Sequence, residues 1–293
     1  MCGIVGYLGA KEAYPILVKG LKRLEYRGYD SAGVALLNRN GIEIFKKQGK
    51  VLNMEESVPA DYPKAQIGIA HTRWATHGVP NDINSHPHYS QSNKIAIIHN
   101  GIIENYAAIK KGLIKRGYTF KSDTDTEVLV NLIEDILINE QVDLAEAVRI
   151  ALNQVVGAYA IAVIEEGNFD QIIVAKKGSP LVIGLGENEY YIASDATPFI
   201  EYTKQAVYLD EEEVAVLSLK NGLDLRTISN ELKTPYIQEL ELELESIEKG
   251  GYEHFMLKEI NEQPKSIFDT LRGRLIVDEG TIRLGGFIEY EQK

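Results

Sequence analysis

The order of strand-like and helical segments along the chain restricts its fold more than any other feature. Strand-like segments such as 3–9 and 93–101 come first, two helices follow at 122–137 and 143–157, and strand-like segments separated by turn residues fill 158–219. Strands joined by such short turns pair antiparallel. We therefore expect an α+β fold, in which two antiparallel sheets pack together with helices outside, and not a doubly wound parallel sheet.

Both central helices begin with a capping signature. Thr124 precedes Glu127, and Asp143 precedes Glu146, at the three-residue spacing of a capping box. In the first of these helices, apolar residues recur every three or four positions and predict one buried face. That face consists of Val128, Leu129, Leu132, Ile133 and Ile136.

Turn and stop residues define the remaining elements. Residues 11–26 and 106–117 are predicted to be helices, the second of them ended by Gly117. The Asn40-Gly41 pair predicts a hairpin between two short strands. Residues 27–33 are predicted to be a glycine-bounded loop.

Length, charge and cysteine usage exclude several classes of protein. A chain of 293 residues can bury one sizeable core, with or without an appendage. The net charge of −12 argues against binding to nucleic acid or to an anionic membrane surface. No apolar run has the length of a membrane span, and the first residues lack the pattern of a signal peptide. One cysteine allows no intrachain disulfide, so we expect a cytoplasmic protein.

The composition changes near residue 239, which predicts a main domain at 2–238 and a connecting segment at 239–293. The acidic stretch 239–245 alternates Leu and Glu, so an edge strand is an alternative to a connector there. Residues 252–275 have a helical pattern that we expect Pro264 to interrupt.

The only cysteine of the chain, Cys2, directly follows the initiator methionine. It is either an incidental small apolar residue of a first strand or, once Met1 is removed, a residue that carries both a thiol and a free α-amine. A thiolate is a good nucleophile, and an α-amine titrates near pH 8 and can act as a base. Position alone favours the incidental interpretation.

Two further segments have both a structural and a catalytic interpretation. Asn100-Gly101 ends an apolar strand, where it is either a common turn or a pair of donors that stabilise an oxyanion. Residues 71–78, "HTRWATHG", are either a solvated loop or a carboxylate-binding loop with Arg73 and Trp74 buried. For the second segment the two interpretations are equally favoured.

Three charged or aromatic residues near helix and loop ends also have two interpretations, and for Asp125 the structural one is favoured. Asp125 at a helix start either complements the helix dipole or binds an ammonium group. Arg27 and Tyr29 lie either in a mobile loop or in a plain connection.

Two patterns are set aside. His86, His88 and His99 have no carboxylate or cysteine at metal-ligand spacing, so we predict no metal site and expect these histidines to be ordinary surface or core residues. Residues 184–190, "GLGENEY", lie between strands with no helix behind them, so no dinucleotide site is predicted.

Five segments together resemble the glutaminase domains of the glucosamine-6-phosphate synthases, which are N-terminal-nucleophile amidotransferases. They are "MCGIVGY", "LKRLEYRGYDSAG", "GIAHTRWATHG", "HNGIIENY" and "GYTFKSDTDTEV", and the similarity extends from residue 2 to about residue 275. The resemblance implies a four-layer αββα sandwich with the glutaminase domain at 2–238. Cys2 would then be the nucleophile, and Asn100 and Gly101 the oxyanion donors.

The resemblance also implies how glutamine is held. Arg73, Thr76 and His77 would form the substrate-binding loop, with Arg73 on the carboxylate. Gly101 and Asp125 would contact the α-amino group.

Three other residues would control access. Trp74 would be a gate between the glutamine site and an ammonia tunnel, and Arg27 and Tyr29 would lie in a loop that closes over glutamine.

The implied reaction converts L-glutamine to glutamate and ammonia through a Cys2 thioester, without a cofactor or metal. The ammonia would serve the conversion of fructose-6-phosphate to glucosamine-6-phosphate in a sugar isomerase domain. The residues after 275 are too few to form that domain, so we expect this chain to act as a separate glutaminase part, monomeric where the full-length family enzyme is a homodimer. The alternatives are the glutaminase part of another amidotransferase and a catalytically silent assembly module.

Overall fold

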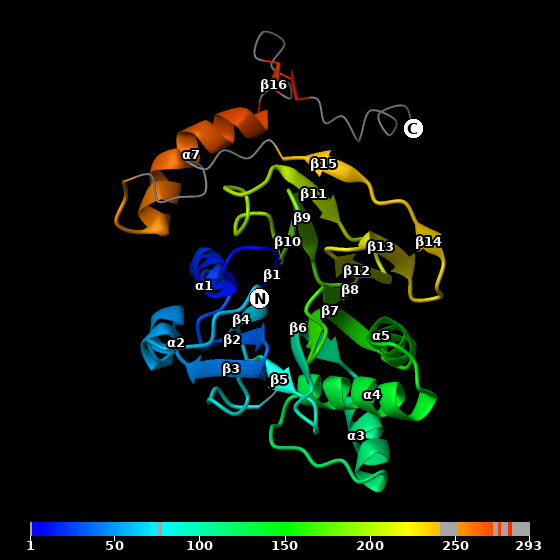
Figure 1. The fold of residues 1–293 in the computed structure, drawn as a ribbon. Coiled ribbons are helices and arrows are strands. Elements are labelled where there is room, and N and C mark those ends of the chain that lie inside the picture. Colours follow the sequence, from blue (N-terminus) through cyan, green and yellow to red (C-terminus); the bar gives the residue numbers. More distant parts are fainter. Residues whose placement is uncertain (1, 76–77, 241–250, 272–274, 277–280, 283–293) are drawn as a thin grey trace. The chain divides into compact units, whose positions relative to one another are not determined.

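The computed structural model describes residues 2–75, 78–240, 251–271, 275–276 and 281–282 (Figure 1). The chain divides into two compact units, Met1–Glu241 and Leu242–Lys293, which we describe separately. The first unit contains two antiparallel sheets and five of the helices in the described residues.

In the described part of the first unit, one sheet has eight strands in the order β15-β11-β9-β10-β1-β4-β2-β3. Their bounds, in chain order, are β1 (Gly3–Leu8), β2 (Ser31–Asn38), β3 (Gly41–Gln48), β4 (Ile67–Arg73), β9 (Val182–Gly186), β10 (Glu189–Ala193), β11 (Gln205–Tyr208) and β15 (Ile237–Glu239). The N-terminal strand β1 therefore lies inside the sheet, between β10 and β4. This position fixes where residue 2 emerges.

The other sheet has seven strands among the described residues, in the order β14-β13-β12-β8-β7-β6-β5. These strands are β5 (His88–Tyr89), β6 (Ile95–Ile103), β7 (Gly157–Glu165), β8 (Gln171–Lys177), β12 (Glu213–Ser218), β13 (Gly222–Thr227) and β14 (Leu232–Lys233). The long strands β6 and β7 pair along their whole lengths, from Ile95 opposite Glu165 to Ile103 opposite Gly157.

Helices cover the outer face of each sheet (Figure 1). The helices are α1 (Ala13–Leu24), α2 (Val51–Ser57), α3 (Tyr106–Lys115), α4 (Asp125–Glu140) and α5 (Leu144–Asn153). Helix α1 packs on β1 and β4, α2 packs on β3, and α4 packs on β6 with α3 and α5 beside it. The predicted four-layer αββα sandwich is confirmed.

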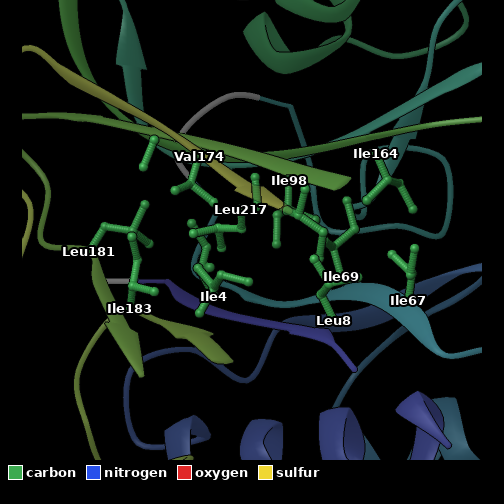
Figure 2. Close-up of a cluster of buried hydrophobic side chains, with 14 of the residues drawn as sticks. Ile4, Leu8, Ile67, Ile69, Ile98, Ile164, Val174, Leu181, Ile183 and Leu217 are labelled. Atoms are coloured by element: carbon green, nitrogen blue, oxygen red, sulfur yellow. The ribbon is translucent and has the colours of Figure 1, made fainter. Parts of the chain in front are cut away.

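The space between the two sheets is filled by aliphatic side chains from both (Figure 2). Ile4 and Ile69 of the first sheet meet Ile98, Ile164 and Val174 of the second, and all are fully buried. Burying each such side chain contributes about 1.5–3 kcal/mol. The two sheets are therefore held face to face, which brings the ends of β1, β4 and β6 together.

Several local predictions are confirmed. The Thr124 side chain accepts a hydrogen bond from the Glu127 N–H, and the Asp143 side chain accepts one from the Glu146 N–H at 2.8 Å. Gly117 has a φ of +93° just after α3.

The predicted hairpin is present as well. It joins β2 to β3, with Asn38 opposite Gly41, whose φ is +120°.

One predicted element boundary was wrong, and one helix was not predicted. The predicted loop 27–33 ends at Asp30, because Ser31 already pairs with Gln48 of β3 and Arg73 of β4. In addition, the short helix α2 had not been anticipated.

In the second unit, helix α7 (Phe255–Leu271) runs through Pro264 without interruption, against expectation. A proline inside a helix removes one N–H donor and favours a kink, but it does not oblige the helix to end. The short strands β16 (Leu275–Ile276) and β17 (Thr281–Ile282) pair antiparallel. Most of the alternating stretch 239–245 lies outside the described residues, so its structure stays a prediction.

Candidate active site

The pairing of β1 with β4 places Cys2 beside the predicted substrate loop. Gly3 lies opposite Thr72, so Cys2 comes next to the end of β4 at Arg73 and Trp74. The Trp74 N–H donates a hydrogen bond to Cys2 Sγ at 3.1 Å, and Sγ lies 3.5 Å from the Trp74 carbonyl oxygen. The thiol thus lies just before the start of β1, where its sulfur is hydrogen-bonded beside the end of β4, and it does not pack as an incidental apolar residue of the core.

Cys2 lines a cavity of about 470 Å³, a volume typical of small-molecule sites. The cavity brings together seven of the ten residues singled out from the sequence. These are Cys2, Arg27, Arg73, Trp74, Asn100, Gly101 and Asp125.

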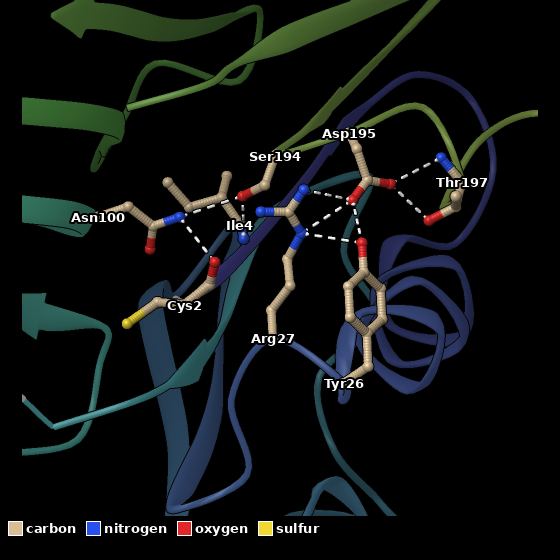
Figure 3. A network of polar contacts seen from close by, with 8 residues as sticks. All are labelled: Cys2, Ile4, Tyr26, Arg27, Asn100, Ser194, Asp195 and Thr197. Atoms are coloured by element: carbon tan, nitrogen blue, oxygen red, sulfur yellow. Dashed lines mark hydrogen bonds and ion pairs between the residues drawn. The ribbon is translucent and has the colours of Figure 1, made fainter. Parts of the chain in front are cut away.

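Strand β6 delivers Asn100 and Gly101 to this cavity. Asn100 Nδ2 donates to the Cys2 carbonyl oxygen at 3.1 Å and to Ser194 Oγ at 3.1 Å (Figure 3). Gly101 has a φ of +135°, and a Cβ atom there would lie 2.0 Å from the Ala158 carbonyl oxygen. Only glycine fits this position. Because both residues are inside β6, the interpretation of Asn100-Gly101 as a simple turn is wrong.

Buried charges of both signs line the cavity. Arg73 and Asp125 are each only 4% exposed. Arg73 donates to the Gly78 carbonyl oxygen at 3.3 Å, and Asp125 Oδ2 accepts from the Ile103 N–H at 2.8 Å. A cavity with a guanidinium and a carboxylate suits a ligand that carries both a carboxylate and an ammonium group.

Arg27 is fixed by a network on the wall of the cavity (Figure 3). Its guanidinium forms an ion pair with Asp195 at 2.7 Å, and the Tyr26 hydroxyl donates to the same carboxylate at 2.7 Å. Tyr29 meets the indole ring of Trp74 edge to face, with ring centroids 5.6 Å apart. Two side chains of the segment predicted as a loop or plain connection, Arg27 and Tyr29, therefore contact residues of the site.

The thiol of Cys2 is predominantly protonated near neutral pH. Burial raises the pKa of Cys2 above its ordinary value, and the hydrogen bond from the Trp74 N–H opposes only part of that rise. A group that removes the thiol proton is consequently needed before the sulfur can act as a nucleophile.

One side chain of the predicted substrate loop is more exposed than expected, and two others lie outside the described residues. Trp74 is 49% exposed, against the expectation that it is buried, because the chain leaves the sheet at Arg73. Thr76 and His77 lie outside the described residues, so their assignment to the substrate loop stays a prediction.

The histidines set aside at first lie close to the site. His86, His88 and His99 are buried, and His86 and His99 line the cavity. The described residues contain no group of three or more His, Cys, Asp or Glu side chains arranged to hold a metal ion. They also contain no helix with the length and apolar character needed to cross a membrane.

Sequence reasoning missed His71, Ser194 and Asp195. His71 Nε2 lies 2.8 Å from Asn100 Oδ1, and Ser194 and Asp195 contact Asn100 and Arg27. The one available signal was a polar Ser-Asp pair directly after a buried strand.

The fold and the position of Cys2 define an N-terminal-nucleophile amidotransferase. Among solved structures, the chain is similar to glutamine phosphoribosylpyrophosphate amidotransferase from B. subtilis, with a TM-score of 0.68, 27% identity, and coverage of 79% of this chain and 50% of that one. Residues 59–236 match the model of the glutamine amidotransferase domain family, and the chain belongs to this family.

Curated relatives are much closer in sequence. The chain is 55% identical to glutamine–fructose-6-phosphate aminotransferase (isomerizing) from Bacteroides thetaiotaomicron, over 100% of this chain and 48% of the relative. It is 54% identical to the enzyme of the same name from Chlorobaculum tepidum, over 99% of this chain and 48% of the relative. The chain thus spans about half the length of the curated relatives that it matches.

Proposed function

We propose that this chain hydrolyses L-glutamine to glutamate and ammonia through a thioester on Cys2. The observation that carries the proposal is that one cavity contains the Cys2 thiol, the Asn100 carboxamide, and the buried charges of Arg73 and Asp125. A neutral amide that carries an amino acid head group matches this combination of nucleophile, hydrogen-bond donor and paired charges.

In the proposed mechanism, Met1 is removed and the α-amine of Cys2 takes the thiol proton. The thiolate attacks the side-chain carbonyl carbon of glutamine, and the negative charge moves to the carbonyl oxygen. Asn100 Nδ2 redirects to this oxyanion the N–H that it otherwise donates to the Cys2 carbonyl oxygen, and the Gly101 N–H donates the second hydrogen bond. Losing one such donor typically lowers the rate by about 100–1,000-fold. The C–N bond then breaks, and the leaving nitrogen takes the proton from the α-ammonium and departs as ammonia.

The second half-reaction restores the enzyme. The α-amine removes a proton from a water molecule that attacks the thioester carbon, and the same two donors stabilise the second oxyanion. The C–S bond breaks, glutamate leaves, and the sulfur regains the proton. No cofactor is needed in either half.

The two ends of the amino acid select the substrate. Arg73 binds the α-carboxylate as a bidentate donor, and Asp125 binds the α-ammonium. Simple amides leave both charged side chains unpaired in a buried site, so they are rejected. Trp74, with Tyr29 at its edge, and Arg27 lie at the cavity wall, where they control access.

We further propose that the ammonia serves fructose-6-phosphate in the whole protein, as the names of the relatives suggest. The whole protein would form glucosamine-6-phosphate in the cytoplasm, while the part described here would act alone as a monomeric glutaminase. Glutamate release should be measured with and without fructose-6-phosphate and the C-terminal half of the Bacteroides relative. Amino sugar formed without that half would contradict this assignment.

The Cys2→Ala variant tests the central proposal. We expect it to bind glutamine in a calorimetric titration, to keep the melting temperature of the wild type, and to release no glutamate above background. A thiol-alkylating glutamine analogue should label the wild type on Cys2, and mass spectrometry should find Met1 absent. Substantial turnover by Cys2→Ala would contradict the nucleophile assignment, and an unlabelled, inactive wild type would favour the silent assembly module.

A further inference from the structure

The carboxamide of Asn100 is hydrogen-bonded at both ends. Its Oδ1 lies 2.8 Å from His71 Nε2, and its Nδ2 donates to the Cys2 carbonyl oxygen and to Ser194 Oγ, each at 3.1 Å. Asn100 is on β6 in one sheet, His71 is on β4 in the other, and Ser194 directly follows β10. The carboxamide is therefore held by side chains from outside its own sheet.

The hydrogen bonds fix which way the carboxamide faces. His71 Nε2 also lies 3.1 Å from the His99 carbonyl oxygen, which can only accept. Nε2 must therefore carry a proton, and the atom of Asn100 that faces it must be the oxygen. The Cys2 carbonyl oxygen also can only accept, so it independently requires the nitrogen of Asn100 on the other side.

His71 provides an N–H donor that does not depend on pH in the physiological range. Burial lowers the pKa of His71 to about 3, so the ring is neutral with a single N–H. The ring stacks on His86, with centroids 4.3 Å apart and planes 19° apart, and the side chain is 1% exposed. Burial and the stacking on His86 keep Nε2 directed at Asn100.

Ser194 holds the nitrogen end and is itself anchored to β1. Its Oγ accepts from the Ile4 N–H at 2.9 Å, and its own N–H donates to the Ile4 carbonyl oxygen at 3.1 Å (Figure 3). Ser194 is 2% exposed, so water does not compete for these bonds. Cys2 directly precedes the same strand, which couples the position of the Asn100 nitrogen to that of the thiol.

From this geometry we infer that His71 and Ser194 are positioning residues that keep the N–H end of Asn100 turned toward the reacting carbonyl group. The inference rests on the proposed glutaminase function. Neither His71 nor Ser194 is among the residues that line the cavity, so each acts through Asn100. Without His71, Oδ1 loses this donor, and the bonds from Nδ2 to the Cys2 carbonyl oxygen and to Ser194 Oγ must alone oppose a half turn of the carboxamide. That half turn would present the oxygen to the oxyanion and replace attraction by repulsion.

The variants His71→Leu and His71→Gln separate positioning from packing. The amide nitrogen of Gln is as many bonds from Cα as His Nε2, so it can replace the donor, whereas Leu cannot. We expect His71→Leu to lower kcat for glutamine hydrolysis by about 10–100-fold, with KM changed by less than about 3-fold. His71→Gln should recover most of this loss.

Alkylation of Cys2 by iodoacetamide is the second measurement, because this displacement forms no oxyanion. We expect His71→Leu and Ser194→Ala to be alkylated at the wild-type rate while kcat falls. His88→Leu is the matched control, since His88 is equally buried and contacts Thr124 instead of Asn100. An unchanged kcat in both test variants, or an equal loss in His88→Leu, would overturn the inference.

A readout that needs no turnover distinguishes this inference from the proposed function. The side-chain amide protons of Asn100, assigned in a ¹⁵N spectrum by their loss in Asn100→Asp, should exchange slowly with water in the wild type and faster in His71→Leu. A wild type that releases no glutamate but shows this difference retains the positioning and contradicts only the proposed reaction. Equal exchange in both proteins contradicts the positioning.

Discussion

Ser194 and Asp195, two consecutive residues after β10, hold opposite parts of the candidate active site. Ser194 Oγ accepts from Asn100 at 3.1 Å, and Asp195 Oδ2 accepts from Arg27 Nε at 2.8 Å (Figure 3). Asp195 also accepts from both the N–H and the hydroxyl of Thr197, which fixes the turn. A change at Asp195 should therefore displace the Arg27 side chain at the cavity wall while leaving Asn100 in place.

Replacing Asp195 by Asn removes the charge that holds Arg27. Burial alone would raise the pKa of Asp195. The pKa is nevertheless held below its ordinary value by hydrogen bonds from Thr197 and Tyr26 and by the charge of Arg27. We expect Asp195→Asn to lower the free energy of unfolding by about 1–3 kcal/mol at pH 7, because hydrogen bonds to a charged group are lost. KM for glutamine should rise more than kcat falls, as measured by steady-state glutamate release.

The matched control for this variant is Asp224→Asn. Asp224 pairs with Arg226 on the surface, where both side chains are 43% exposed, so the loss should be about 0–1 kcal/mol with no change in KM. The Asp195 contribution is complete above an unfolded pKa of about 4 and is lost as the pH falls through the lower folded pKa. Equal unfolding free energies and equal KM values in the two variants would contradict the assigned role of Asp195.

A methyl group at position 101 should be incompatible with β6. Gly101→Ala would place Cβ 2.0 Å from the Ala158 carbonyl oxygen at a φ of +135°. We expect the variant to lose about 3 kcal/mol or more of unfolding free energy, and to lose glutaminase activity with it. Urea denaturation followed by circular dichroism measures the first quantity.

Gly167→Ala serves as the comparison because it shares the strain of a positive φ but not the steric clash. Gly167 also has a positive φ, +86°, but no atom lies within 4 Å of the position that a Cβ would take. We expect a loss of about 1–2 kcal/mol and wild-type turnover. A Gly101→Ala variant as stable as Gly167→Ala would mean that β6 and β7 can separate at no cost.

Local signals in the sequence predicted most helices and strands, whereas contacts between distant segments could not be predicted from such signals. The capping of α4 by Thr124 was predictable because donor and acceptor are three residues apart. The contact of Trp74 with Cys2 joins residues 72 apart, and the contact of Ser194 with Ile4 joins residues 190 apart. Such pairs depend on the strand order β10-β1-β4, which hydrophobic periodicity does not encode.

Burial was the second property that residue type alone could not decide. The polar segment 85–88, "SHPH", left open whether its histidines lie at the surface or in the core. The structure buries His86 and His88, with hydrogen bonds to Thr126 and Thr124. Trp74, by contrast, is half exposed. Polar side chains can be buried where partners satisfy them, and those partners belong to other elements.

The buried histidines should make the fold sensitive to acid. Burial lowers the pKa of His71 to about 3, and it lowers the pKa values of His86 and His88 well below their ordinary value. The unfolded state therefore binds more protons below pH 6.5, so the free energy of unfolding falls as the pH falls, by about 1.4 kcal/mol per pH unit for each histidine.

Urea denaturation at pH 7.5, 6 and 5 measures this dependence. The slope between pH 6 and pH 5 should decrease in a His88→Gln variant, since one buried titrating group is removed. His254→Gln is the control, because His254 is exposed in the second unit. A pH dependence that is unchanged in His88→Gln would show that other groups cause the acid sensitivity.

The raised pKa of Cys2 predicts an alkaline reactivity profile. An ordinary cysteine has a pKa near 8.5, and burial raises that of Cys2. The rate of alkylation by iodoacetamide follows the thiolate fraction, so we expect it to rise with pH and to reach half its maximum above about pH 8.5.

Glutamine hydrolysis should not follow this profile at neutral pH, because the α-amine removes the thiol proton only as the sulfur attacks. The two profiles, measured on the same preparation between pH 6 and pH 10, should diverge. A half-maximum below pH 8 for alkylation would mean that the free enzyme already holds a thiolate, and that the hydrogen bond from the Trp74 N–H and nearby positive charges outweigh burial.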